Sequence, residues 1–175
     1  MKTILFLYAL FMLITPARAD VQNGLCFLKT QAEIENFYRH GHCAGRSTRV
    51  AKGVSKGVSI QPDRVGVLFE FDASALKPEF YALLAEWGSA LQNLADMHFS
   101  IHGHTDYIGD AAYNLQLSQQ RAQSVKDYLV RMYQIDPARL QIAAYGESQP
   151  LRGNLQQQSD HDRRWNRRVE FVKMP

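Results

Sequence analysis

The sequence predicts an α/β fold, a two-layer sandwich in which helices pack on one face of a mixed sheet. Short β-rich runs alternate with two long stretches of helical periodicity between residues 64 and 175. Gly and Pro residues separate these segments, as expected where elements end. No internal run approaches the roughly 20 apolar residues of a membrane-spanning helix. The resulting order, strand, helix, strand, helix, strand, strand, is typical of a two-layer α/β domain.

Four segments have the composition of β-strands. The first is a compact β-rich run that follows Pro62 and Asp63. The second ends at Gly103, and the third follows the helix breaker Asp136-Pro137. A polar loop over residues 147–162 is expected before the last. The predicted strands cover residues 65–71, 97–102, 139–145 and 167–172.

Two segments have the apolar spacing of amphipathic helices. Pro78 opens the first, because its fixed φ suits the first helical turn. The second runs over residues 110–133. The apolar stripe of the first helix consists of Phe80, Leu83, Leu84, Trp87, Leu91 and Leu94, and that of the second includes Leu117, Val125, Leu129 and Met132.

The amino terminus has the features of a secretory signal peptide over residues 1–19. Lys2 is the basic residue, residues 4–14 are apolar, and Ala17-Arg18-Ala19 is a small-x-small site that predicts cleavage before Asp20. An uncleaved membrane anchor is the alternative, although the apolar run is short for a span.

Removal of residues 1–19 changes the charge balance. Without Lys2 and Arg18, the 20 basic residues of the chain become 18 against 17 acidic ones, which leaves a net charge of +1. A polyanion-binding protein would keep a clear basic excess, so nucleic acid is not an expected partner.

Residues 20–63 form a separate segment with two cysteines, Cys26 and Cys43. In an exported protein the default expectation is a disulfide between them. The apolar residues of the intervening stretch predict a short helix, and residues 45–61 resemble a basic linker. Metal binding by His40-Gly-His42-Cys43 is the alternative, which lacks a second closely spaced cysteine. The helix residues are Ala32, Ile34, Phe37 and Tyr38.

The main domain, residues 64–175, lacks the common catalytic patterns. It has no GxSxG, HExxH or P-loop sequence. His102 and His104 lie two residues apart at a strand end and could form a metal site with Asp106, or one His packs under the loop while the other hydrogen-bonds locally. We expect no catalytic residue, no metal and no cofactor.

A binding site is better supported. Asp106 lies in a loop that leads into the second helix, where Asn114, Leu117, Ser118 and Arg121 share one face. A carboxylate and a guanidinium on adjacent elements can hold the ammonium and carboxylate groups of an amino acid. An internal Asp106–Arg121 ion pair is the alternative. We expect Arg121 at the polar edge of its helix.

Four motifs in order resemble the OmpA-like carboxy-terminal domain, a family that includes the peptidoglycan-associated lipoprotein and flagellar stator proteins. The resemblance spans about residues 64 to 173, and its most specific part is the pattern GHTD…YN..LS..RA..V. The motifs are FEFDASALKP (residues 69–78), IHGHTDYIGDAAYNLQLSQQRAQSVKDYL (101–129), RLQIAAYGESQP (139–150) and NRRVEF (166–171).

The resemblance implies non-covalent binding of peptidoglycan through the diaminopimelate of its stem peptide. Asp106 would bind the ligand ammonium and Arg121 its carboxylate. Arg167, rather than Arg168, is the expected contact from the last motif. Asp72, Thr105, Asn114 and Leu117 would complete the pocket.

The chain also departs from the family pattern. Tyr107 and Ile108 give the loop after Asp106 an apolar tip, which is either a partner contact or a packed loop. We expect a periplasmic protein, associated with the cell wall and outer membrane, whose residues 20–63 dock on an outer-membrane or envelope-complex protein. The alternative is a structural subunit of a secretion or motor complex that keeps the fold without binding the wall.

Overall fold

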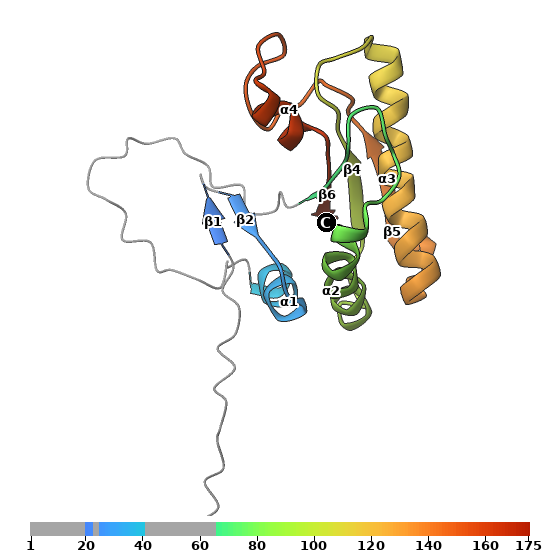
Figure 1. The fold of residues 1–175 in the computed structure, drawn as a ribbon. Coiled ribbons are helices and arrows are strands. Elements are labelled where there is room, and N and C mark those ends of the chain that lie inside the picture. Colours follow the sequence, from blue (N-terminus) through green and yellow to red (C-terminus); the bar gives the residue numbers. More distant parts are fainter. Residues whose placement is uncertain (1–19, 23–24, 41–65) are drawn as a thin grey trace, which may run out of the picture.

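The computed structural model describes residues 20–22, 25–40 and 66–175. Its centre is a mixed sheet of four strands in the order β3, β6, β4, β5 (Figure 1). β4 and β5 are parallel, while β6 runs antiparallel to both of its neighbours. The predicted mixed sheet is thus confirmed. The strands are β3 (Gly66–Leu68), β4 (Phe99–Gly103), β5 (Leu140–Ala144) and β6 (Arg168–Lys173).

The helices α2 and α3 lie side by side against the sheet (Figure 1). Short 3₁₀ turns at Pro78–Phe80 and Pro137–Arg139 lead into α2 and β5. A separate antiparallel pair, β1 (Asp20–Gln22) and β2 (Leu25–Phe27), precedes the first helix. The helices are α1 (Gln31–His40), α2 (Tyr81–Asn93), α3 (Ala111–Tyr133) and α4 (Asp160–Asn166). None of these described helices is long and apolar enough to cross a membrane.

The first strand is shorter than the sequence predicts. β3 ends at Leu68, although the Phe69 amide still donates to the Arg167 carbonyl at 2.9 Å. The chain then turns at Phe71 and Asp72, and Asp72 adopts a left-handed φ of 55°. This turn carries the aromatic side chain of Phe71 and the acidic side chain of Asp72 out of the sheet, where both become part of the site described below.

The predicted loop over residues 147–162 contains the start of a helix that sequence periodicity missed, α4. Its N-terminus is held by a capping box, in which the Ser159 hydroxyl accepts from the Asp162 amide and the Asp162 carboxylate accepts from the Ser159 amide. An aspartate at the third helical position replaces the usual Glu or Gln. The helix is only 7 residues long, so it has no apolar repeat to detect.

The short helix predicted in the amino-terminal segment is confirmed as α1, and it packs into the main core. Rings from α1, α2, β4 and β6 form an aromatic cluster of Tyr38, Trp87, Phe99 and Phe171. Trp87 stacks on Phe171 with ring centroids 4.0 Å apart, and Tyr38 meets Phe99 edge-on at 4.9 Å. Ile34 and Phe37 are buried beside them. α1 therefore shares the hydrophobic core of the domain.

Three predictions for the amino-terminal part fall on residues outside the described ranges. The predicted signal peptide covers residues 1–19, whereas Cys43 of the expected disulfide with Cys26 and the predicted linker over residues 45–61 lie in the undescribed stretch 41–65. All three stay predictions, as does the domain boundary near residue 64.

Candidate functional site

A pocket of about 390 Å³ opens where β4 ends and the following loop leads into α3. Its walls come from the turn after β3, from that loop, from α3 and from Arg167, which directly precedes β6. All seven predicted site residues line it: Asp72, Thr105, Asp106, Asn114, Leu117, Arg121 and Arg167. Phe71, Ile108, Gly109, Asp110 and Tyr113 complete the lining. We call this the charged pocket.

Two close approaches bring α3 onto the strand ends. A Cβ at Gly103 would lie 1.9 Å from the Ser118 carbonyl oxygen, so only glycine fits where β4 passes the helix. Gly146 has a left-handed φ of 52°, and its amide donates to the Ser118 hydroxyl at 3.0 Å. The Asp110 carboxylate starts the helix by accepting from the Tyr113 amide at 2.8 Å. These contacts fix the first turns of α3 against the loop that carries Asp106.

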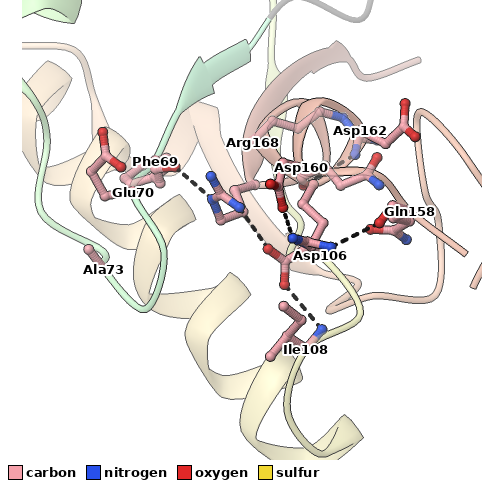
Figure 2. A network of polar contacts seen from close by, with 12 residues as sticks. Phe69, Glu70, Ala73, Asp106, Ile108, Gln158, Asp160, Asp162 and Arg168 are labelled. Carbon is pink, nitrogen blue, oxygen red and sulfur yellow. Dashed lines mark hydrogen bonds and ion pairs between the residues drawn. The ribbon is translucent and has the colours of Figure 1, made fainter. Parts of the chain in front are cut away.

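Asp106 is 3% exposed and holds two partners. One carboxylate oxygen accepts from the Ile108 amide at 3.1 Å, and the other accepts from Arg167 Nη1 at 2.8 Å (Figure 2). Arg167 also donates from Nε to the Phe69 carbonyl at 3.1 Å. The direct ion-pair partner of Asp106 is therefore Arg167, and not Arg121 as the alternative for this site assumed.

The choice of Arg167 over Arg168 agrees with this geometry. Arg168 is buried and donates from Nε to the Glu170 carboxylate at 2.5 Å. The two arginines therefore lie in different surroundings, and Arg167 is the one that lines the charged pocket.

The expectation that Arg121 lies at the polar edge of its helix is wrong. Arg121 is 0% exposed, because the turn after β3 and the end of β4 cover this part of α3. Its guanidinium donates to three backbone carbonyls, those of Ala73 at 2.8 Å, His104 at 3.0 Å and Glu70 at 3.0 Å. It also lies over the Phe69 ring, 5.3 Å from the centroid.

Burial lowers the pKa of Arg121 to about 10, against the opposing effect of the nearby Asp106 carboxylate. The guanidinium is still protonated at neutral pH. Its five N–H groups exceed the three carbonyls that it reaches, so N–H groups remain for a further acceptor in the pocket.

Three apolar side chains lie at the pocket opening, and two of them, Phe71 and Tyr113, were missed by sequence reasoning. Phe71, Ile108 and Tyr113 are 58%, 39% and 44% exposed. Ile108, one of the two residues of the apolar tip after Asp106, therefore lies at the pocket opening. The sequence offered one signal that could have identified Phe71 and Tyr113, since each directly precedes a predicted site residue.

Polar contacts hold the pocket side chains in place. The Tyr113 hydroxyl donates to the Asp72 carboxylate, and this hydrogen bond raises the pKa of Tyr113. The side-chain amide of Asn114 donates to the Glu147 carboxylate. In the described part of the chain, the buried Thr105 hydroxyl oxygen has no hydrogen-bond partner.

The metal site considered for His102, His104 and Asp106 does not form, because the Asp106 carboxylate pairs with Arg167. The two histidines instead lie near Glu170, with candidate ligand atoms within 4.8 Å of one another. Glu170 is opposite His102 in the β4–β6 register and already accepts from Arg168. This group is a buried polar network on the strands, separate from the lining of the charged pocket.

Comparison with known proteins now gives the family. A family model described as the OmpA family matches residues 68–164, more than half of the chain. The chain belongs to the OmpA family. The resemblance stated from the four sequence motifs is confirmed.

Among curated proteins, the chain is 36% identical over 117 residues to outer membrane porin F of Pseudomonas aeruginosa. The match covers 67% of this chain and 32% of the porin, so the chain spans about a third of the length of this relative.

Two solved structures share the fold. The peptidoglycan-associated lipoprotein from Burkholderia pseudomallei has a TM-score of 0.58 at 27% identity, covering 63% of this chain and 91% of that one. The cell wall anchor of the T6SS from Pseudomonas aeruginosa has a TM-score of 0.50 at 31% identity, covering 59% and 72%. These relatives are a porin, a peptidoglycan-associated lipoprotein and a cell wall anchor, in agreement with the prediction that this chain is not an enzyme.

Proposed function

We propose that this chain binds peptidoglycan without cleaving it, through the diaminopimelate residue of the stem peptide, and so anchors an outer-membrane or envelope-spanning complex to the cell wall. The observation that carries the proposal is the meeting of Asp106, Arg121 and Arg167 in one pocket. Diaminopimelate presents an ammonium and a carboxylate on the same carbon, so it needs both signs of charge within a few ångströms of each other.

The pocket suits such an end group. The Asp106 carboxylate, already held by the Ile108 amide, binds the ligand ammonium. The remaining N–H groups of Arg121 and the Thr105 hydroxyl, which has no partner among the described residues, bind the carboxylate. A volume of about 390 Å³ is at the small end of ligand pockets, and fits one amino-acid side chain better than a polymer segment.

The named relatives support the same conclusion. One structural neighbour is a peptidoglycan-associated lipoprotein and another is a cell wall anchor of a secretion system. A protein of this kind needs access to the wall, so we place this chain in the periplasm, beside the cell wall and outer membrane. The protein partner docks through residues 20–63.

One observation favours the alternative of a structural subunit that does not bind the wall. The charges of the pocket already have partners within the chain, since Asp106 pairs with Arg167 and Arg121 donates to three carbonyls. In that case the same side chains would serve only to join the turn after β3 to α3.

Sedimentation with purified sacculi tests the proposal. Wild-type protein is expected in the pellet, and Asp106→Asn is expected to lose at least about tenfold in affinity, because the amide keeps the shape and removes the charge that the ammonium needs. Asp127→Asn, at an exposed aspartate of helix α3, is the matched control and should pellet like wild type. Wild-type protein that stays in the supernatant contradicts wall binding and supports the structural alternative.

The identity of the ligand requires a second comparison. Sacculi whose stem peptides carry lysine in place of diaminopimelate lack the distal carboxylate. Binding should fall with these sacculi, and free diaminopimelic acid should release the bound protein. Equal binding to both kinds of sacculi would keep wall binding and overturn the diaminopimelate assignment.

A further inference from the structure

The opening of the charged pocket is apolar, whereas its interior is charged. Phe71 comes from the turn after β3, Ile108 from the loop after β4, and Tyr113 from the first turn of α3. We call these three residues the apolar rim. Three exposed apolar side chains from separate segments meet here around one pocket, which is how binding surfaces differ from scattered apolar residues.

The rim is held in place before any ligand arrives. Tyr113 stands on α3, and its hydroxyl donates to Asp72, the neighbour of Phe71. Asp72 itself has a left-handed φ of 55°, a conformation that a non-glycine residue keeps only where its surroundings impose it. Ile108 is tied to the pocket interior by its amide, which donates to Asp106 (Figure 2). The Tyr113 ring, fixed in this way, loses little entropy when a ligand contacts it.

We propose that the apolar rim is a saccharide subsite, which contacts an N-acetylhexosamine of the peptidoglycan strand whose stem peptide enters the charged pocket. This inference rests on the proposed function. Aromatic faces and the Ile108 side chain fit the C–H face of a pyranose ring and the methyl of an N-acetyl group. The sugar hydroxyls point sideways from that face and keep their contacts with water.

A peptide occupant fits the rim less well. A peptide backbone brings amide groups that lose hydrogen bonds with water unless the protein replaces them. The side chains of Phe71 and Ile108 offer no polar atom, and the Tyr113 hydroxyl already donates to Asp72. The rim therefore favours a ligand whose polar groups can remain outside the contact.

Calorimetric titration of the full chain with three wall fragments tests the subsite: free diaminopimelic acid, the stem tetrapeptide, and the disaccharide tetrapeptide. Wild-type protein should bind the disaccharide tetrapeptide about tenfold more tightly than the tetrapeptide. Phe71→Ala should remove most of this gain, so that its affinity for the disaccharide tetrapeptide approaches its own affinity for the tetrapeptide. Met132→Ala is the matched control, because Met132 is also 58% exposed but lies near the far end of α3.

The outcomes separate this inference from the proposed function. If wild-type protein binds diaminopimelic acid and tetrapeptide but gains nothing from the disaccharide, the saccharide subsite is overturned and the pocket assignment stands. If Phe71→Ala weakens the tetrapeptide as much as the disaccharide form, the rim contacts the stem peptide instead, which also overturns the inference. Failure of wild-type protein to bind diaminopimelic acid contradicts the proposed function itself.

Discussion

The rings of the aromatic cluster and the charged groups Asp106 and Arg121 of the pocket are buried, but different interactions hold them. In the cluster, four rings from α1, α2, β4 and β6 pack together, and the hydroxyl of Tyr38 donates to a backbone carbonyl. In the charged pocket, Arg121 donates to the carbonyls of Ala73 and of His104, which directly follows β4. Arg167 donates to the carbonyl of Phe69. The cluster depends on contact area, and the pocket depends on directed hydrogen bonds.

This difference matters because apolar contacts and buried charges respond differently to change. Apolar packing loses stability roughly in proportion to the atoms removed. A buried charge is costly unless every partner is present, so the loss of one group leaves others unsatisfied. The pocket therefore joins the turn after β3 to α3 as well as being the proposed ligand site. Its variants must be tested for folding and for binding separately.

The largest effect on stability is expected in the aromatic cluster. Trp87 is buried and stacks on Phe171, so Trp87→Ala should lower the free energy of unfolding by about 3 to 5 kcal/mol. Urea denaturation followed by circular dichroism measures this change. Trp165→Ala is the control, because Trp165 is only partly buried, and its loss should cost less than about 1.5 kcal/mol. Equal effects of the two substitutions would contradict the central place of Trp87 in the core.

The next largest effect is expected at Arg121. Arg121→Ala leaves the carbonyls of Glu70, Ala73 and His104 without this donor, and should lower the free energy of unfolding by about 3 kcal/mol. Arg121→Lys should recover only part of the loss, since one ammonium cannot copy the planar fork. The measurement is again urea denaturation.

Arg131 is the matched control for Arg121. It is an exposed arginine in the last turn of the same helix, so Arg131→Ala should stay within about 0.5 kcal/mol of wild type. An Arg121→Ala protein as stable as Arg131→Ala would show that its three hydrogen bonds contribute nothing net. It would also return Arg121 to the role expected from the sequence, a group used mainly for ligand binding.

The sequence was sufficient for the elements with long, regular patterns. The helix predicted over residues 110–133 is α3 at Ala111–Tyr133, because apolar spacing continues over many turns. α4 escaped detection because a helix of 7 residues shows no such repeat, and only its Ser159–Asp162 capping box marks it. Local pattern therefore predicts long elements better than short ones.

For the site, the sequence predicted the membership of the pocket but not all of its internal contacts. Asp106, Arg121 and Arg167, which the motifs selected, line one pocket in the structure. The burial of Arg121 could not be predicted, because two of the three carbonyls that it reaches, those of Ala73 and Glu70, are 48 and 51 residues away in sequence. Helical spacing places a side chain on a face, whereas what covers that face is decided by tertiary packing.

The smallest effect concerns the attachment of α1 to the domain. The buried Tyr38 hydroxyl donates to the Phe171 carbonyl at 2.8 Å, and the family match begins only at residue 68. Tyr38→Phe keeps the ring and removes the donor, so it should lower the free energy of unfolding by about 1 kcal/mol. Tyr81→Phe is the control, because Tyr81 is an exposed tyrosine at the start of α2 and should leave the midpoint of urea denaturation unchanged. If Tyr38→Phe also leaves the midpoint unchanged, the hydroxyl adds nothing to the docking of α1. A lower midpoint would mean that α1, although it precedes the matched region, stabilises the OmpA-family domain and is not free to serve only as a docking segment for the proposed protein partner.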